Sequence, residues 1–252
     1  MSEAGSGIRR ILLALSGAAD ELAWIDAAAE LAAAMEAELS ALFVEDVDLL
    51  RASRLPGMWE MGRYSARLRQ MQADSTQRWL QAAARRSEQA LLRAAEARSL
   101  RFSFRILQGK PLHTLLAQAA SLDLVWLGRR VLVATARPRP LAVLFDGSLA
   151  ATGTLAVGLR LARATGRPCL VLVVAADAQT YRERAQQAGW AVGGHTGVSM
   201  QRLSDTDPAV LATVVNGVRA AALVLPADAV EGDLARLDAL RSRLQCDLLL
   251  VI

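Results

Sequence analysis

Short apolar runs recur along this sequence, and each is followed by a turn and a segment with helical periodicity. The clearest run is Leu141–Phe145, which ends at Asp146-Gly147-Ser148. A continuous apolar run of this length is typical of a parallel strand covered on both faces. Gly147 permits a tight turn from strand to helix, and Ser148 is suited to cap the helix that follows. The pattern therefore predicts a strand, a tight turn and a helix.

The beginning of the chain repeats this pattern. The run Ile11–Leu15 is again apolar, ends at Ser16-Gly17, and precedes an alanine-rich helical segment. Turns of this kind lie at the carboxyl ends of parallel strands, where open α/β sheets bind ligands. We interpret the chain as two related halves, residues 1–136 and 137–252.

In both halves, strand and helix patterns alternate. In the first half the predicted strands are Ile11–Leu15, Glu38–Val44, Arg101–Leu107 and Asp123–Gly128. One predicted helix begins at Asp20 or Glu21, a second covers about residues 65–96, and a third begins at Pro111. The region around Pro56 and Gly57 is interpreted as a loop or short helical turns. In the second half the predicted strands are Leu141–Phe145, Cys169–Ala175, Val198–Leu203, Ala221–Leu225 and Asp247–Ile252. This alternation predicts parallel sheets with right-handed crossovers.

The first half is shorter than the second. After its fourth strand, only Val131–Thr135 and the segment Arg137-Pro138-Arg139-Pro140 precede the second half. Because a terminal apolar strand must be paired or covered, we expect Val131–Thr135 to pair with Asp247–Ile252. The two halves would then form an internal pseudo-dimer. The predicted fold class is α/β, with two tandem Rossmann-like domains, each a parallel sheet flanked by helices, the first truncated after its fourth strand.

Composition excludes several classes of protein. At 252 residues, 53% hydrophobic and 21% charged, the chain has the make-up of an ordinary globular protein. Its apolar runs are much shorter than the ~20 residues that a spanning helix needs, so we expect no membrane insertion and a cytoplasmic location. The net charge of +4 comes from arginines mixed with acids. Without a recognisable motif beside them, they predict no nucleic-acid binding.

Candidate reactive side chains are few. Cys169 and Cys246 each open an apolar run and are interpreted as free core thiols. His113 and His195 have no neighbours at metal-ligand spacing, so no metal site is expected. The apolar faces of the predicted elements also place Trp24, Trp79 and Trp126 in the core.

The paired halves, the element order and Phe145-Asp146-Gly147-Ser148 resemble the universal stress protein family in its tandem form. The stretch Ala41–Leu50 is also similar to the exit of the second strand in bacterial tandem members. The resemblance implies an adenine nucleotide alpha hydrolase-like fold whose members dimerise through their last strands. Many members bind ATP: an Asp after the first strand contacts the adenine, and a glycine-rich loop after the fourth strand holds the phosphates.

The resemblance implies a nucleotide-binding position in each half. In the second half the corresponding residues are Asp146, Gly147, Ser148 and Val174. Their first-half counterparts are Ser16, Gly17, Val44 and Gly128. Ser16 therefore stands where the family has the adenine-contacting Asp.

The phosphate loop of the family is incomplete in both halves. Gly128 matches its first glycine, but Val131 stands at the second. In the second half these two positions are Pro226 and Ala229. Glycines allow main-chain N–H groups to close around a phosphate, and proline has no N–H to donate. We therefore expect no tightly bound cofactor, although weak binding of ATP or AMP stays open.

Three functions follow, in decreasing order of preference. The first is a non-catalytic stress-response or regulatory protein that acts through protein–protein contacts, with a partner or by self-association. The second is an adenine-nucleotide sensor that uses the Asp146-Gly147-Ser148 turn. The third is an ATP pyrophosphatase-like enzyme, because Ser16-Gly17-Ala18-Ala19-Asp20-Glu21 is similar to a phosphate-binding loop of that class. Ala18 replaces a glycine there, and Glu21 brings a negative charge, so we expect no catalytic residues.

Overall fold

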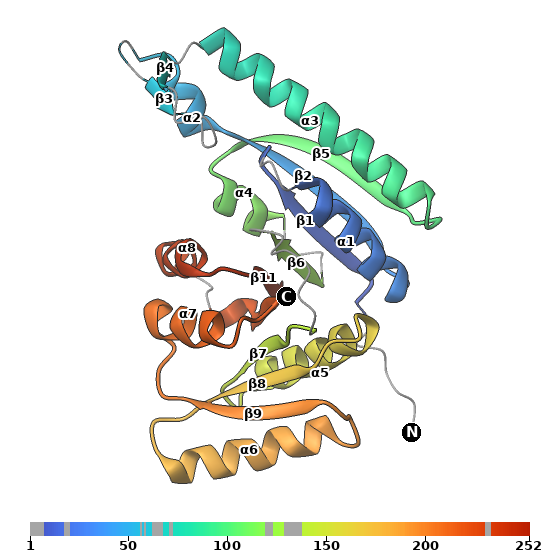
Figure 1. Ribbon diagram of the computed structural model, residues 1–252, viewed down its shortest axis with the longest axis vertical. Coiled ribbons are helices and arrows are strands. Elements are labelled where there is room, and N and C mark those ends of the chain that lie inside the picture. Colours follow the sequence, from blue (N-terminus) through green and yellow to red (C-terminus); the bar gives the residue numbers. More distant parts are fainter. Residues whose placement is uncertain are drawn as a thin grey trace.

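A nine-stranded sheet with helices on both faces forms the body of the protein (Figure 1). The computed structural model describes residues 8–17, 21–55, 57, 59–61, 68–70, 73–118, 123–128, 138–229 and 233–252. The strand order is β5-β2-β1-β6-β11-β10-β7-β8-β9, and all neighbouring strands are parallel except β6 and β11. The fold is therefore α/β with a mostly parallel sheet, as the alternating pattern predicts.

The first half supplies four strands of this sheet. They are β1 (Arg10–Leu15), β2 (Glu38–Asp46), β5 (Phe102–Gly109) and β6 (Leu124–Leu127). The helices of this half are α1 (Glu21–Ala34), α2 (Val47–Ala52), α3 (Ala73–Glu96) and α4 (Pro111–Ala117). Counted within the half, the strands lie in the order 3-2-1-4.

The second half repeats that order and adds a fifth strand. Its strands are β7 (Leu141–Phe145), β8 (Cys169–Val174), β9 (Val198–Leu203), β10 (Ala222–Pro226) and β11 (Asp247–Val251). Its helices are α5 (Leu149–Ala164), α6 (Ala178–Val192), α7 (Pro208–Gly217) and α8 (Leu234–Arg243), with a 3₁₀ turn, η2, over Ala227–Ala229. The shared order makes the internal repeat visible in the topology.

The two halves meet at β11. This strand pairs in parallel with β10 on one side and antiparallel with β6 on the other, where Leu249 lies opposite Trp126. The sequence-based expectation was wrong about the pairing partner, because β6 and β10 occupy both hydrogen-bonding edges of β11. Val131–Thr135 and the expected boundary between residues 136 and 137 lie outside the described residues.

The segment between β2 and α3 also differs from expectation. The long helix begins at Ala73 and not near residue 65, because residues 68–70 form β4. This short strand pairs antiparallel with β3 (Trp59–Met61) in a separate two-stranded sheet. Periodicity did not reveal the pair, since three residues are too few for a helical and an extended pattern to differ.

Two apolar cores lie on opposite faces of the sheet. Helices α1, α3, α5 and α6 contribute to one core, and α4, α7 and α8 contribute to the other. Cys169 and Cys246 are buried and form no disulfide, and Trp24 and Trp126 are buried as well. Trp79 corrects the expectation, because 46% of its surface is exposed. Among the described helices, none combines the length and apolar character required to cross a membrane.

Candidate functional site

The turn after β7 places Asp146, Gly147 and Ser148 at the carboxyl end of the sheet. Gly147 has a φ of 89°, a conformation that glycine adopts without strain. The N–H of Ser148 donates to Asp146 Oδ1 over 2.9 Å, and the N–H of Ala151 donates to Ser148 Oγ over 3.0 Å. Ser148 is thus the N-cap of α5, as its position predicts. Asp146 holds the turn, so its carboxylate already has a structural partner.

Main-chain atoms beside this turn are occupied by side chains of α6. Arg184 Nη1 donates to the carbonyl oxygen of Val174 at the end of β8, over 2.5 Å. Gln187 Nε2 donates to the carbonyl oxygen of Gly147 over 3.1 Å. An adenine ring that approached these carbonyls would have to displace both side chains. The helix therefore covers the part of the crevice between β7 and β8.

A small cavity remains on the other side of Asp146. Its volume is about 180 Å³, and its walls come from the ends of β7 and β10 and from α7 and α8. Arg236 lines it and is held in place, because Nη2 donates to the carbonyl oxygen of Thr206 over 2.8 Å and to Oγ1 of Thr206 over 2.7 Å. Ligand pockets usually measure about 300–1,000 Å³. The cavity is too small for a whole nucleotide.

The position of the second-half phosphate loop has a different structure. Strand β10 ends at Pro226, and Ala229 lies in the η2 turn. Asp233 caps the helix that follows, because its Oδ1 accepts from the N–H of Arg236 over 2.8 Å. A carboxylate therefore accepts a hydrogen bond at the amino-terminal end of α8, where an anionic ligand would otherwise be favoured.

In the first half, a buried carboxylate lies beside the turn after β1. Glu21 is 2% exposed, and its Oε1 accepts from the N–H of Ser16. Its other oxygen accepts from Ser87 Oγ over 3.1 Å, which connects the turn to α3. An acidic side chain at this point is unfavourable for a bound phosphate group. The three residues 18–20 lie outside the described part of the chain.

Two tryptophans cover the glycines of the first-half crevice. A Cβ built on Gly128 would lie 2.5 Å from Cδ2 of Trp24, so the indole ring rests on the backbone there. A Cβ on Gly17, whose φ is 83°, would lie 3.0 Å from Cη2 of Trp79. Val44 is buried at the end of β2. The space beside these glycines is thus filled by protein side chains.

The structure shows where the predicted residues lie and which side chains contact them. The structure brings Asp146, Gly147, Ser148 and Val174 together at the ends of β7 and β8. Their counterparts lie at the ends of three adjacent strands: Ser16, Gly17, Val44 and Gly128. The sequence analysis did not identify Arg184 and Gln187 as residues that contact this turn. Their spacing of three residues, which places them on one helix face, was the only sequence pattern that could have indicated a shared role. Among the described residues, no cluster of His, Cys, Asp and Glu could hold a metal ion.

Comparison with solved structures shows a likeness over the whole chain. A universal stress protein from Archaeoglobus fulgidus DSM 4304 superposes with a TM-score of 0.62 at 11% sequence identity, over 96% of this chain and 95% of that one. A protein of unknown function from Pseudomonas aeruginosa PAO1 superposes with a TM-score of 0.58 at 12% identity, over 99% and 94%. The sequence matches no protein-family model and no curated protein. The chain therefore has the fold of universal stress proteins, and the likeness lies in structure.

Proposed function

We propose that this chain is a non-catalytic regulatory protein with the universal stress protein fold. It acts through protein contacts in the cytoplasm and does not bind ATP tightly. The observation that carries this proposal is that side chains of the protein itself lie against the candidate nucleotide-binding residues of both halves. Trp24 lies on Gly128 in the first half, and Arg184 binds the carbonyl of Val174 in the second.

Nucleotide titration tests the negative part of the proposal. Isothermal titration calorimetry of the full chain with ATP and with AMP is expected to show no binding with a Kd in the range of about 1 μM. The double variant Arg184→Ala/Gln187→Ala removes the side chains that cover the carbonyls, so any latent adenine site would gain affinity. Arg182→Ala, an exposed position on the same helix, is the control. Micromolar binding by the wild-type chain contradicts the proposal.

A second experiment separates nucleotide sensing from a purely structural role of Asp146 in the turn. Asp146 lies beside a cavity, and its Oδ2 has no hydrogen-bond partner in the described part of the chain, which is the observation that favours a sensor. If the carboxylate only holds the turn, Asp146→Ala lowers the free energy of unfolding by about 1 kcal/mol, and AMP leaves the melting temperatures of both proteins unchanged. If it recognises adenine, AMP raises the melting temperature of the wild type and not that of the variant.

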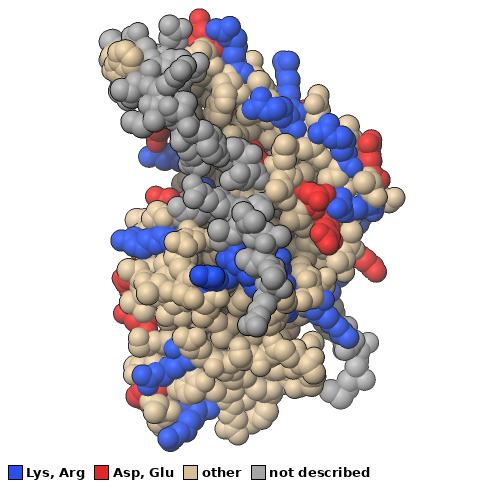
Figure 2. Space-filling model, in the orientation of Figure 1, with Lys and Arg blue, Asp and Glu red and all other residues tan. Residues whose placement is uncertain are grey.

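The protein-contact part of the proposal is supported by exposed apolar side chains. Leu149 is 93% exposed, Trp190 is 75% exposed and Trp59 is 59% exposed. Lys and Arg side chains are spread over both halves of the face shown in Figure 2. Size-exclusion chromatography with light scattering tests self-association, with Trp190→Ser and Trp59→Ser as variants. A partner captured by the wild type and lost by one of these variants supports the proposal, whereas a monomer that captures no protein contradicts it.

A further inference from the structure

We propose that the pocket at the amino-terminal ends of β8 and β9 binds a small phosphate monoester. The pocket lies at the ends of the strands opposite to the Asp146 turn. It is enclosed by the carboxyl end of α5 and a glycine-rich turn, residues 193–197. Its volume is about 560 Å³, within the usual range for small-molecule sites. This inference does not depend on the state of the two crevices described above.

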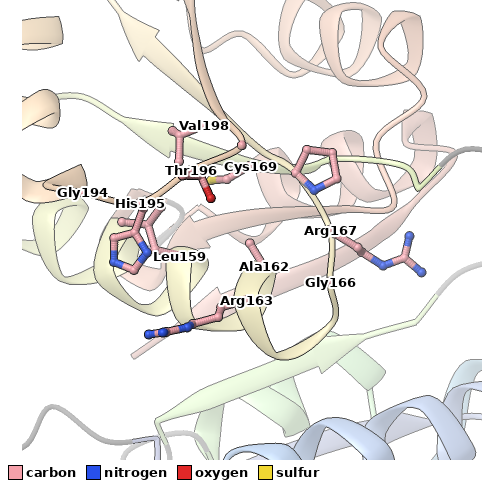
Figure 3. A pocket seen from close by; sticks show the side chains of 12 residues that line it. Leu159, Ala162, Arg163, Gly166, Arg167, Cys169, Gly194, His195, Thr196 and Val198 are labelled. Carbon is pink, nitrogen blue, oxygen red and sulfur yellow. The ribbon is translucent and has the colours of Figure 1, made fainter.

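The charge of the pocket favours an anion. Arg163, Arg167 and His195 line it, and none of its lining residues is acidic. In Figure 3 the guanidinium of Arg163 and the imidazole of His195 lie on the same side of the pocket, whereas Arg167 extends to the other side. Arg167 Nη1 is directed to the carbonyl oxygen of Arg139. The guanidinium of Arg163 and the ring of His195 form no hydrogen bond or ion pair within the described chain, so both are available to a ligand.

Further hydrogen-bond donors come from the glycine-rich turn. The hydroxyl of Thr196 points into the pocket in Figure 3 and has no partner among the described groups. The main-chain N–H groups of Gly194 and Gly197 likewise donate to no other group described in the structure. The N–H of His195, which lies between them, donates to the carbonyl oxygen of Val192, so Gly194 and Gly197 offer two separate donors to phosphate oxygens. A phosphate offers several oxygens to such a set of donors, and arginine binds them well.

Hydrogen bonds at the carboxyl end of α5 reduce its repulsion of an anion. The last carbonyl groups of a helix carry partial negative charge, but three of the last four accept hydrogen bonds here. The N–H groups of Thr165, Gly166 and Arg167 donate to the carbonyl oxygens of Leu161, Arg163 and Ala162. Thr165 Oγ1 adds a second bond to the carbonyl of Leu161, over 2.7 Å.

The inner wall of the pocket determines the kind of ligand. Leu159, Ala162, Pro168 and Val198 provide apolar surface for an organic group attached to the phosphate. Cys169 also lines the wall, and burial raises the pKa of its thiol to about 11. The thiol therefore stays protonated near neutral pH and is a poor nucleophile. The site is suited to binding and not to covalent chemistry.

Titration of ¹⁵N-glycine-labelled protein with phenyl phosphate tests the proposal. We expect saturable shifts of the amide signals of Gly194 and Gly197, with little change at Gly147. Phenol, which lacks the phosphate, should cause no such shifts, and inorganic phosphate should bind more weakly than phenyl phosphate. Arg163→Gln and His195→Gln should each weaken binding about tenfold, because each removes a charged or polar donor to the phosphate.

Controls keep the result interpretable. Arg182→Gln, on an exposed part of α6 outside the pocket, should leave the affinity unchanged. Circular dichroism should show that every variant is folded, which is expected because Arg163 and His195 are exposed. The proposal is overturned if phenyl phosphate causes no saturable shift up to about 10 mM, a concentration at which even binding of about 1 mM would be detected. It is also overturned if Arg163→Gln binds as well as the wild type.

Discussion

The indole ring of Trp24 lies so close to Gly128 that a Cβ at residue 128 would be 2.5 Å from Cδ2 of the ring. Trp24 belongs to α1 and is 4% exposed, and Gly128 directly follows β6. Glycine at residue 128 therefore permits the close approach of a helix to the end of a strand. The sequence resemblance had assigned Gly128 to the first glycine of a phosphate loop. Here it serves packing.

Replacement of this glycine tests that conclusion. Gly128→Ala forces the buried ring of Trp24 to move, so we expect a loss of about 1–3 kcal/mol in the free energy of unfolding. Urea denaturation of the purified protein measures the loss.

A double-mutant cycle shows whether Trp24 is the cause. Trp24→Phe has a smaller ring and makes room for the added methyl group. The double variant Trp24→Phe/Gly128→Ala should therefore be more stable than the sum of the two single changes indicates. Strictly additive losses would show that the strain of Gly128→Ala arises elsewhere.

A second prediction compares the same substitution, glycine to alanine, at two positions of α5. A Cβ at Gly158 would lie 2.5 Å from Cγ2 of Val143 in β7, whereas a Cβ at Gly153 would have no neighbour within 4 Å. Alanine favours a helix over glycine by up to about 1 kcal/mol. Gly153→Ala should therefore raise the free energy of unfolding by up to that amount. Gly158→Ala should lower it by about 1–2 kcal/mol net, because overpacking exceeds the gain in helix propensity.

Thermal or urea unfolding of both variants checks this prediction. The two substitutions are chemically identical and lie in one helix, so the difference between them reports the contact with β7 alone. Equal stabilities would mean that α5 can shift away from Val143 at no cost.

The elements with long apolar patterns were predicted most accurately from the sequence. Strands such as Leu141–Phe145 and Cys169–Val174 are continuous apolar runs, and each was located to within about a residue. The cap Ser148 was also identified, because its side chain acts on the N–H group of Ala151, only three residues away. Local chemistry was sufficient for these features.

Features that depend on distant parts of the chain were not predictable in this way. β11 pairs with β6, although more than a hundred residues separate them in sequence. Trp79 was expected in the core, yet its indole lies over Gly17 with 46% of its surface exposed. The contact of Arg184 with Val174 depends on how α6 packs against the ends of two strands. These contacts join residues in different parts of the fold, and the local patterns of a single sequence do not indicate them.

The two thiols provide a third prediction. Cys169 and Cys246 are buried, and burial raises the pKa of Cys169 to about 11. The thiolate is the reactive form, so at pH 8 the folded protein should react very slowly with Ellman's reagent. Both thiols should react at once in a denaturing concentration of urea. Rapid reaction of one thiol in the folded protein would mean that the start of β8 or the segment before β11 opens readily.

Asp177 provides a prediction about pH, because it caps the helix that covers the second crevice. Its Oδ1 accepts from the N–H groups of Gln179 and Thr180, each over 2.8 Å, and its Oδ2 accepts from Thr180 Oγ1 over 2.8 Å. These hydrogen bonds, led by the one from the main chain of Thr180, lower the pKa of the carboxyl group. The charged form is therefore favoured in the folded protein.

The sign of the pH dependence follows from that shift. A carboxyl group whose pKa is lower in the folded than in the unfolded chain stabilises the fold above the unfolded pKa of about 3.9. This contribution is lost as the pH falls through the folded pKa. Asp177→Asn retains a capping side chain without the charge, so the wild type should be the more stable protein at pH 7, and its advantage should shrink as the pH falls below the unfolded pKa of about 3.9.

Urea unfolding of both proteins across this pH range provides the test. Asp238→Asn, at an exposed position of α8 where no hydrogen bond is described, is the control. This substitution removes one negative charge without removing a capping bond, so it controls for the change in net charge. A constant difference between Asp177→Asn and wild type from pH 7 to pH 3 would show that the charge of Asp177 does not stabilise α6. In that case, the helix would hold Arg184 and Gln187 over the crevice by packing alone.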